Sequence, residues 1–303
     1  MLQQKRLLIL SDGKPGHLNQ SIAFARHLGC EYDVLPVAFR SRIAKGFSYF
    51  ADRLRLRLEF LFTNKPISGS YGAVVSAGSE TYYANRVLAD KLSIKSIAIM
   101  LPKGYRYDFD LIVAQQHDDP PQQRNIISLP INLTYVDPQG LVQPEGGRKY
   151  VSVIIGGDSK QGVLEAGPLR EQLRKVFELF PEHDFWVTTS RRTSASVEAV
   201  LREFSWNRAV YYSQEKINPI PDFLAHCEYV FLTADSTSMI SEAVSYGQSC
   251  VEILSPAEEG KGGKFYRMME CLQEAGALRR FDGTLHSANK KIDLSQALQG
   301  STL

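Results

Sequence analysis

Apolar runs recur along the first half of the chain, and stretches with helical spacing separate them. The runs show no alternation of apolar and polar residues, which is typical of strands that helices cover on both faces of a parallel sheet. We therefore predict an α/β fold for this half, with a Rossmann-like arrangement. The expected strands are RLLIL (6–10), YDVLPV (32–37), YGAVVSA (71–77), SIAIML (96–101), DLIVA (110–114) and NIISLPI (125–131).

The same pattern begins again in the second half, after a segment at 137–148 that is rich in Pro and Gly and poor in apolar residues. Such a composition indicates a connection between domains. We predict two Rossmann-like domains facing across a cleft, 1–145 and 146–303, with a last helix that can pack back on the first. The expected strands of the second domain are YVSVII (150–155), DFWVTT (184–189), AVYYS (209–213), YVFLTA (229–234) and SCVEIL (249–254), with a helix at 168–180.

Composition and charge restrict the function classes. A net charge of +2 over 303 residues does not favour nucleic acid as a partner. The four cysteines lack CxxC spacing, and no apolar run approaches the length of a membrane span. We expect a cytoplasmic protein in a reducing compartment.

Ligands of open parallel sheets bind beyond the carboxyl ends of the strands, so the turns after the apolar runs are the candidate sites. The first such turn, SDGKPGHLNQS, supplies Asp12, Lys14, Gly16 and His17. His17 falls in the first turn of a helix, whose N-terminus disfavours the imidazolium form, so a neutral His17 can accept a proton from a hydroxyl nucleophile. Alternatively, His17 only hydrogen-bonds the loop. A later turn, SAGSETYYAN, adds Ser79, Glu80 and Asn85, as acceptor contacts or as a helix cap.

Two turns of the second half combine backbone amides with basic side chains. The turn after the first strand holds Gly156, Gly157, Ser159 and Lys160, which suit a diphosphate, although most Gly-Gly turns are only turns. The next, SRRTS, holds Ser190, Arg191 and Arg192. Guanidinium groups match phosphate oxygens, and the alternative is a capping serine beside solvated charges.

The turn TADSTSMISEAV crowds hydroxyl groups before a helix. Asp235, Ser236, Thr237 and Ser238 precede or open that helix, and Glu242 lies about one turn further on. Hydroxyls and free amides at a helix N-terminus suit a nucleotide diphosphate, and Glu242 can accept hydrogen bonds from ribose hydroxyls. The alternative is a plain N-cap with an exposed Glu242.

Two acidic motifs resemble metal sites, but other interpretations explain them better. Asp108 and Asp110 in DFD open an expected strand, and no further oxygen ligands converge there in the sequence. His117, Asp118 and Asp119 also lack a complementary cluster. We predict no metal.

The segment from Arg40 to Phe62 interleaves basic residues with aromatic and aliphatic ones. One hypothesis is contact with an anionic membrane, peripheral to the inner membrane, close to a lipid-carried acceptor. Core packing of the aromatic face, with the basic face in solvent, explains the same pattern and is the interpretation that we favour.

Together, SDGKPGHLNQS, TTSRRTS and TADSTSMISEAVSYGQS resemble the bacterial relatives of the plant mitochondrial-fission ELM family over most of the chain. That family is grouped with GT-B glycosyltransferases. The resemblance implies a nucleotide-sugar donor held mainly by the second domain and an acceptor approached from the first. Plant relatives act at mitochondria in fission. Relatives commonly carry a proline where this chain has Asp158.

These observations predict a glycosyltransferase that moves a sugar from a nucleoside diphosphate to a saccharide or a lipid-linked cell-envelope acceptor. His17 is the expected base, and Arg192, with Arg191, Lys160 and the helix start after Asp235, stabilises the departing diphosphate. No cofactor is expected beyond the nucleotide-sugar substrate. A nucleotide-sugar epimerase and a non-catalytic nucleotide-sugar-binding or interaction protein remain alternatives.

Overall fold

The structure is a computed structural model that describes residues 6–159, 162–254 and 263–299. The chain divides into two compact units. Unit 1 takes in the chain up to Tyr135 together with the residues from Asp293 onwards, and unit 2 runs from Val136 to Ile292.

Unit 1 is built on a seven-stranded sheet. Its strands are β1 (Leu7–Ser11), β2 (Tyr32–Phe39), β3 (Phe62–Asn64), β4 (Ala73–Ala77), β5 (Lys95–Ile99), β6 (Leu111–Gln115) and β7 (Ile126–Leu129). Its helices are α1 (Pro15–His27), α2 (Arg42–Arg53), α3 (Tyr82–Leu92) and α9 (Leu294–Gln299), with 3₁₀ turns η1 (Glu59–Leu61) and η2 (Gln116–Asp118).

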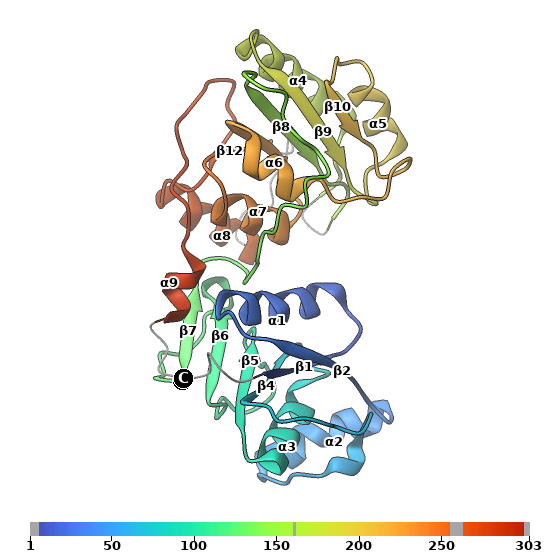
Figure 1. Ribbon diagram of the computed structural model, residues 1–303, viewed down its shortest axis with the longest axis vertical. Helices are drawn as coiled ribbons and strands as arrows, with labels where there is room; N and C mark the ends of the chain where they lie inside the picture. The colour runs from blue at the N-terminus through green and yellow to red at the C-terminus, as the bar shows by residue number, and fades with distance from the viewer. Residues whose placement is uncertain (1–5, 160–161, 255–262, 300–303) are drawn as a thin grey trace. The chain divides into compact units, whose positions relative to one another are not determined.

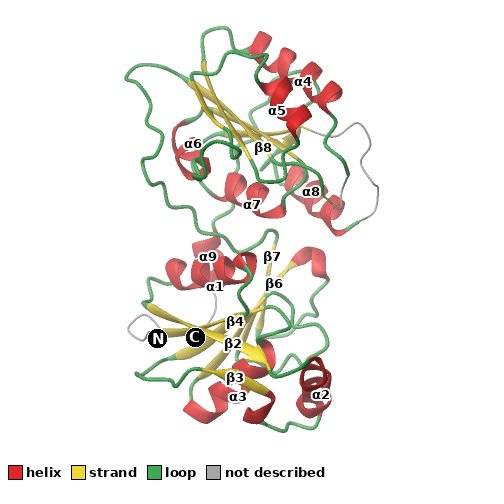
Figure 2. Ribbon diagram, turned by 90° about the vertical axis from the view of Figure 1, so that its right-hand side faces the viewer, coloured by secondary structure: helices red, strands yellow, loops and turns green. Residues whose placement is uncertain are grey.

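The strands of unit 1 lie in the order β3-β2-β1-β4-β5-β6-β7, and only β3 is antiparallel to its neighbour (Figure 1). Helices cover both faces, with α1 and α9 on one and α2 and α3 on the other (Figure 2). The chain moves outward from β1 to β2 and then returns past β1 to β4. This reversal places a topological switch point between β1 and β4, where open α/β sheets bind ligands.

Unit 2 has a six-stranded sheet in which every neighbouring pair is parallel. Its strands are β8 (Tyr150–Ile155), β9 (Asp184–Thr189), β10 (Arg208–Val210), β11 (Tyr229–Thr233), β12 (Cys250–Leu254) and β13 (Arg279–Arg280). Its helices are α4 (Ala166–Leu179), α5 (Ala195–Leu201), α6 (Ile220–His226), α7 (Thr237–Ser245) and α8 (Lys264–Glu274).

The order β10-β9-β8-β11-β12-β13 is the strand order of a Rossmann sheet, with its switch point between β8 and β11. Alternate strand residues face different helices. Val153 and Val187 pack with α4 and α5, whereas the ring of Trp186 lies 5.3 Å from that of Phe223 on α6. The predicted α/β class and the predicted strands are confirmed. The missed strands, β3 and β13, span only three and two residues, too short to produce a hydrophobic pattern.

The connection between the units is anchored on unit 2. The carboxylate of Asp222, which is buried in α6, accepts hydrogen bonds from the backbone amides of Gly140, Leu141 and Val142 at 2.7–3.1 Å. The division therefore comes after Tyr135, earlier than residue 145. The chain end returns to unit 1, where α9 contacts α1 and β7, and the Oγ of Ser295 lies 2.9 Å from the Nδ1 of His27.

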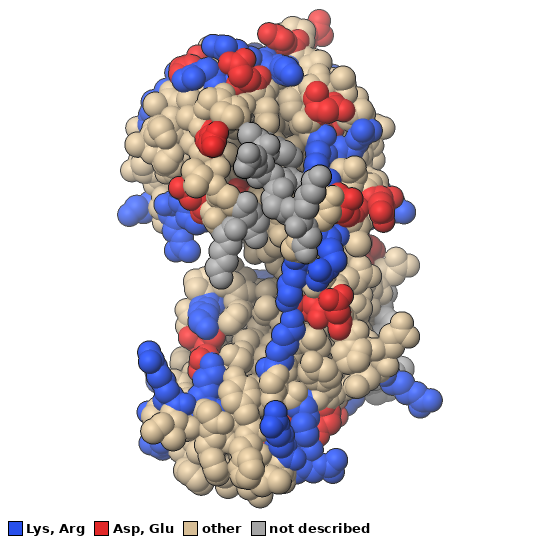
Figure 3. Space-filling model, turned by 180° about the vertical axis from the view of Figure 1, so that it is seen from behind, with Lys and Arg blue, Asp and Glu red and all other residues tan. Residues whose placement is uncertain are grey.

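The segment from Arg40 to Phe62 does not pack as we favoured. Phe47, Phe50 and Phe60 are exposed, so core packing of the aromatic face is wrong for them, whereas Phe62 is buried. Figure 3 looks onto the side of unit 1 that carries α2 and shows Lys and Arg side chains around an area without charge.

Candidate active site

Asp12 and His17 follow β1 at the switch point of unit 1. The Nδ1 of His17 lies 2.9 Å from the Oδ2 of Asp12, whose side chain is only 3% exposed. Burial raises the pKa of Asp12, but hydrogen bonds from His17 and from the Lys14 amide, with the nearby positive charge, bring that pKa below its ordinary value. A carboxylate can only accept, so in the neutral imidazole Nδ1 carries the proton and the lone pair is on Nε2. The pair has the form of a general base with its orienting carboxylate.

Gly78, at the end of β4, lies against the ring of His17. Its φ of +89° lies in the region that favours glycine, and a Cβ there would lie 2.3 Å from the Nδ1 of His17. His17 thus packs directly on the backbone of Gly78. The sequence did not point to Gly78, because only the folded sheet brings the ends of β1 and β4 together.

Lys14 and Gly16 lie in the same turn as the Asp12–His17 pair, and both are exposed. Lys14 is exposed, and its Nζ lies 3.4 Å from the Oδ2 of Asp12. A Cβ at Gly16 would meet open space, so no neighbouring atom requires glycine there.

The residues predicted after β4 make contacts within unit 1. The Nζ of Lys45 donates to Ser79 Oγ at 3.2 Å and to Glu80 Oε1 at 2.5 Å, so both bind α2. Asn85 is fully buried, and its amide donates to the Val74 and Ile97 carbonyls and to Ser76 Oγ. The prediction of Asn85 as an acceptor contact is wrong, since it ties α3 to β4 and β5.

In unit 2, Asp235 joins three strand ends. Its carboxylate accepts from the Gly157 amide at 3.2 Å, from Thr233 Oγ1 at 2.5 Å and from the guanidinium of Arg192 at 2.5 Å. The side chain of Asp235 is 9% exposed. Through these three hydrogen bonds, Asp235 holds the turns together and positions Arg192, a role that differs from the predicted contact with the donor.

Gly156 and Gly157 also serve this junction. The Gly156 amide donates to Thr233 Oγ1 at 2.8 Å, and the Gly157 amide is bound to Asp235. A Cβ at Gly156 would lie 2.0 Å from the Asp235 carboxylate, and one at Gly157 would lie 2.1 Å from the Arg192 carbonyl oxygen. The predicted amide contacts to a diphosphate are wrong for these two residues, because their N–H groups are already bound. At both positions, the absence of a side chain leaves space for the neighbouring turns.

Arg192 spans this junction and still reaches solvent. It donates to the Asp158 carbonyl at 2.9 Å as well as to Asp235, and its side chain is 37% exposed. Ser190 shapes the turn, since its Oγ accepts from the Arg192 amide at 3.1 Å. Arg191 is exposed and forms no ion pair within the described chain, which matches the alternative of a solvated charge. The Oδ1 of Asp158 accepts from the Leu164 amide at 3.0 Å.

Helix α7 begins beside Arg192. Ser236 is its N-cap and accepts from the Met239 amide at 3.4 Å, while Thr237 and Ser238 form the first turn with Ser238 exposed. The first amides of a helix lack intrahelical partners and attract anions. Glu242 is half-buried, which contradicts the alternative of an exposed residue, and burial raises its pKa to about 7.

Ser159 lies at the rim of a small pocket beyond β8, β11 and β12, and its amide donates to the Gly162 carbonyl. The pocket holds about 20 Å³, the room of roughly one water molecule, so it cannot by itself enclose a nucleotide. Lys160, which we predicted to contact the donor, lies outside the described residues.

Residues 15–299 match the model of the family described as mitochondrial fission ELM1. The chain belongs to the mitochondrial fission ELM1 family. This chain of the ELM1 family is also 24% identical, over 289 residues, to the uncharacterized protein RP120 of Rickettsia prowazekii (strain Madrid E), covering 79% of this chain and 80% of that protein.

Solved structures are similar to this ELM1-family chain along most of its length. The glycotransferase of kitacinnamycin superposes with a TM-score of 0.51 at 15% identity, over 96% of this chain and 89% of that one. The glycosyltransferase SnogD from Streptomyces nogalater gives 0.49 at 12% identity, over 97% and 93%. The two sheets, with the match to the glycotransferase of kitacinnamycin, give the ELM1-family chain a GT-B-like fold with two parallel-sheet domains, as predicted.

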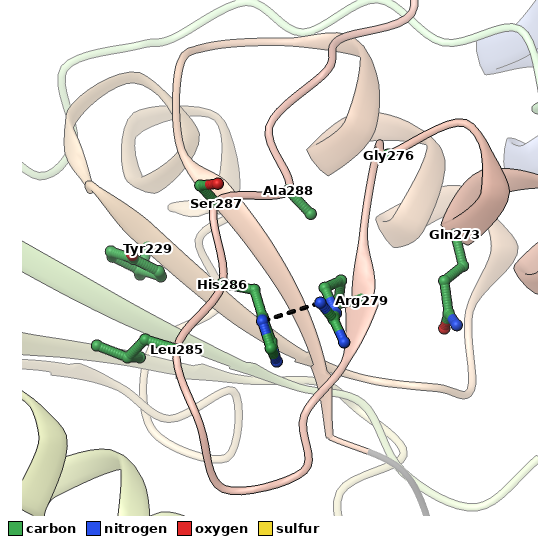
Figure 4. Close-up of a pocket in the computed structure, with 8 residues that line it drawn as sticks. All are labelled: Tyr229, Gln273, Gly276, Arg279, Leu285, His286, Ser287 and Ala288. Atoms are coloured by element: carbon green, nitrogen blue, oxygen red, sulfur yellow. Dashed lines mark hydrogen bonds between the residues drawn. The ribbon is translucent and has the colours of Figure 1, made fainter.

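A second hollow of the ELM1-family chain lies at the opposite strand ends of unit 2. It measures about 770 Å³ and includes Tyr229 and Arg279, the first residues of β11 and β13 (Figure 4). Arg279 donates to the Nδ1 of His286 at 2.9 Å across it (Figure 4). No predicted site residue lines this hollow, and it lies away from the carboxyl ends where such sheets bind ligands.

The acidic motif DFD of the ELM1-family chain is accounted for by protein contacts. Asp108 pairs with Arg86 and Arg106, and Asp110 accepts from the amide and Oγ of Ser96 at 2.8 Å. These bonds agree with a role at the start of β6. Among the described helices, none combines the length and the apolar character that a bilayer crossing requires.

Proposed function

We propose that this chain is a glycosyltransferase that transfers a sugar from a nucleoside-diphosphate sugar to a hydroxyl of a saccharide or lipid-linked acceptor. The GT-B-like fold shared with glycosyltransferases supports the class of reaction. The residues at the two switch points support the assignment of roles within it.

The observation that carries the proposal is the placement of Arg192. Its guanidinium is held by Asp235 and by the Asp158 carbonyl, beside the first turn of α7. A fixed positive group next to a helix N-terminus stabilises the negative charge that develops on a departing diphosphate. Because the guanidinium of Arg192 is already held in place, it needs no rearrangement during the reaction.

In the proposed reaction, the acceptor oxygen attacks the anomeric carbon while the bond from that carbon to the diphosphate oxygen breaks. The bonding electron pair leaves with the diphosphate, next to Arg192 and α7. The hydroxyl proton passes to the Nε2 of His17, and the carboxylate of Asp12 stabilises the imidazolium that forms. The proton goes to His17 and the electron pair to the diphosphate, so the step balances without a further reactant, and the proposal assigns no cofactor.

Glu242 is the residue proposed for the ribose of the donor. It lies on α7, past the amides proposed for the phosphates, and its raised pKa leaves the carboxyl able to donate as well as accept near neutral pH. Each ribose hydroxyl can both donate and accept, so either form of the Glu242 carboxyl can bind it.

The proposal is tested by thermal stabilisation with uridine, cytidine, guanosine and adenosine diphosphate sugars. We expect one base to raise the melting temperature, and Arg192→Ala to remove most of that shift. Arg174→Ala is the matched control, since Arg174 lies on α4 and pairs with Glu171. Absence of a shift with every donor would contradict the proposal. Formation of an epimer from the donor alone would assign the chain to the epimerases instead.

A further inference from the structure

Helix α2 directs two polar residues, Ser48 and Asp52, towards the protein. Ser48 is buried, with its Oγ 2.9 Å from the hydroxyl of Tyr105, and Asp52 is 1% exposed and accepts from the Arg106 amide at 2.9 Å. An ordinary surface helix buries an apolar stripe and exposes its polar face. In α2 the buried face is therefore unusually polar.

The opposite face of α2 is apolar and exposed. Ile43, Phe47, Phe50 and Leu54 follow a spacing of four, three and four residues and are 84%, 43%, 54% and 54% exposed. The rings of Phe47 and Phe50 lie 5.9 Å apart. Phe60, just beyond the helix, is 63% exposed. Large apolar side chains gathered on one exposed face indicate an interaction surface, unlike single exposed ones.

The charged groups around this face are positive. Exposed arginines surround it, and none of them forms an ion pair with a described residue; they are Arg40, Arg42, Arg53 and Arg55. The acidic residues of the segment are not available, since Asp52 is buried and Glu59 pairs with Lys91. On this side of unit 1, Figure 3 shows Lys and Arg side chains at the margin of an uncharged area.

We propose that this surface, named here the α2 face and made of Ile43, Phe47, Phe50, Leu54 and Phe60 with the four arginines, binds the surface of a bilayer that contains anionic lipids. An amphipathic helix with aromatic residues on one side and arginines at its margin lies in the plane of the lipid headgroups. The apolar side chains enter the acyl boundary, and the arginines remain at the level of the phosphates. The proposal goes beyond transferase activity and does not depend on it.

Charge complementarity distinguishes a bilayer from a second copy of this chain. Two α2 faces brought together would oppose their arginines, whereas an anionic bilayer neutralises them. The test below also reports whether the α2 face binds a second copy of this chain.

The experiment is co-sedimentation of the full chain with vesicles of phosphatidylcholine alone or with about 30% phosphatidylglycerol, at low and high salt. We expect binding to the anionic vesicles that weakens as salt rises. The double variant Arg53→Glu with Arg55→Glu should lower the partition coefficient between anionic vesicles and water about 25-fold or more. Each basic residue lost accounts for about five-fold of this change. Arg57 is left intact because it pairs with Asp90.

Phe47→Ser with Phe50→Ser should weaken binding at least as much, at both salt concentrations, because the apolar contribution is not screened. Leu141→Ser is the matched control, since Leu141 is 47% exposed on unit 2. Unchanged melting temperatures would show that the variants are folded.

Equal binding of anionic vesicles by the wild type and both double variants would overturn the proposal, as would no binding by the wild type. Self-association that Phe47→Ser with Phe50→Ser abolishes, without any vesicle binding, would assign the α2 face to a second copy. The donor titrations are made without lipid, so failure here and failure of the proposed function are separate results.

Discussion

Single residues at the switch points decide the proposed chemistry, and Gly78 is the one that the structure adds. Gly78→Ala places a methyl group where the ring of His17 lies, at a φ that only glycine adopts readily. We expect turnover to fall about 100-fold, the low end of the contribution of a general base. Steady-state kinetics with the donor that the thermal-stabilisation assay selects would measure this.

The matched control is Gly16→Ala, which meets open space in the first turn of α1. It should leave turnover within about two-fold, and alanine should favour the helix by a few tenths of a kcal/mol. Equal losses for the two variants would contradict the positioning role of Gly78.

A second prediction at the residue scale concerns Glu252, which is fully buried on β12 with neither carboxyl oxygen bound within the described chain. Burial raises its pKa to about 7, partly offset by Arg279. The folded state therefore keeps the proton while the unfolded chain ionises, so stability is highest below the ordinary pKa and falls as pH rises towards 7. The loss is at most about 1.4 kcal/mol per pH unit.

Glu252→Gln removes this ionisation. Melting temperatures measured from pH 5 to pH 8 should fall less steeply for the variant than for the wild type, so the variant gains relative stability as pH rises. Parallel curves for the two proteins would show that Glu252 ionises normally in the fold.

At the scale of elements, helix α7 connects stability with the proposed donor site. Ser236→Ala removes the cap on the Met239 amide and should lower the free energy of unfolding by about 1 kcal/mol. Ser238→Ala is the control in the same turn, and because Ser238 is exposed it should cost little without ligand. Urea unfolding of both variants measures the difference. A larger loss for Ser238→Ala would mean that α7 is capped otherwise.

The strand pattern could be predicted from the sequence, but the contacts between turns could not. The apolar runs and the hydroxyl turn before α7 are local features, so periodicity reveals them. The roles of Asn85 and Gly156 depend on neighbours far along the chain, Ile97 and Asp235 among them. The outward direction of Phe47 and Phe50 was missed because an amphipathic pattern does not say which face a helix buries.

At the scale of the whole molecule, each unit buries its own core, and α9 belongs to unit 1. Leu298 is 1% exposed on α9, and Leu173 is fully buried on α4 of unit 2. Leu298→Ala should lower the stability of unit 1 by about 3 kcal/mol, and Leu173→Ala should do the same to unit 2. Calorimetry should resolve two transitions, each shifted by one variant. One shared transition that both variants shift equally would contradict separate cores.

The most direct test of the proposed chemistry is the release of nucleoside diphosphate from the preferred donor, in the presence of a membrane and saccharide extract that supplies acceptors. The account predicts steady release by the wild type and losses of about 100-fold or more for His17→Gln and for Arg192→Ala. Release by both variants at the wild-type rate, or no release by the wild type from a donor that it binds, would contradict it.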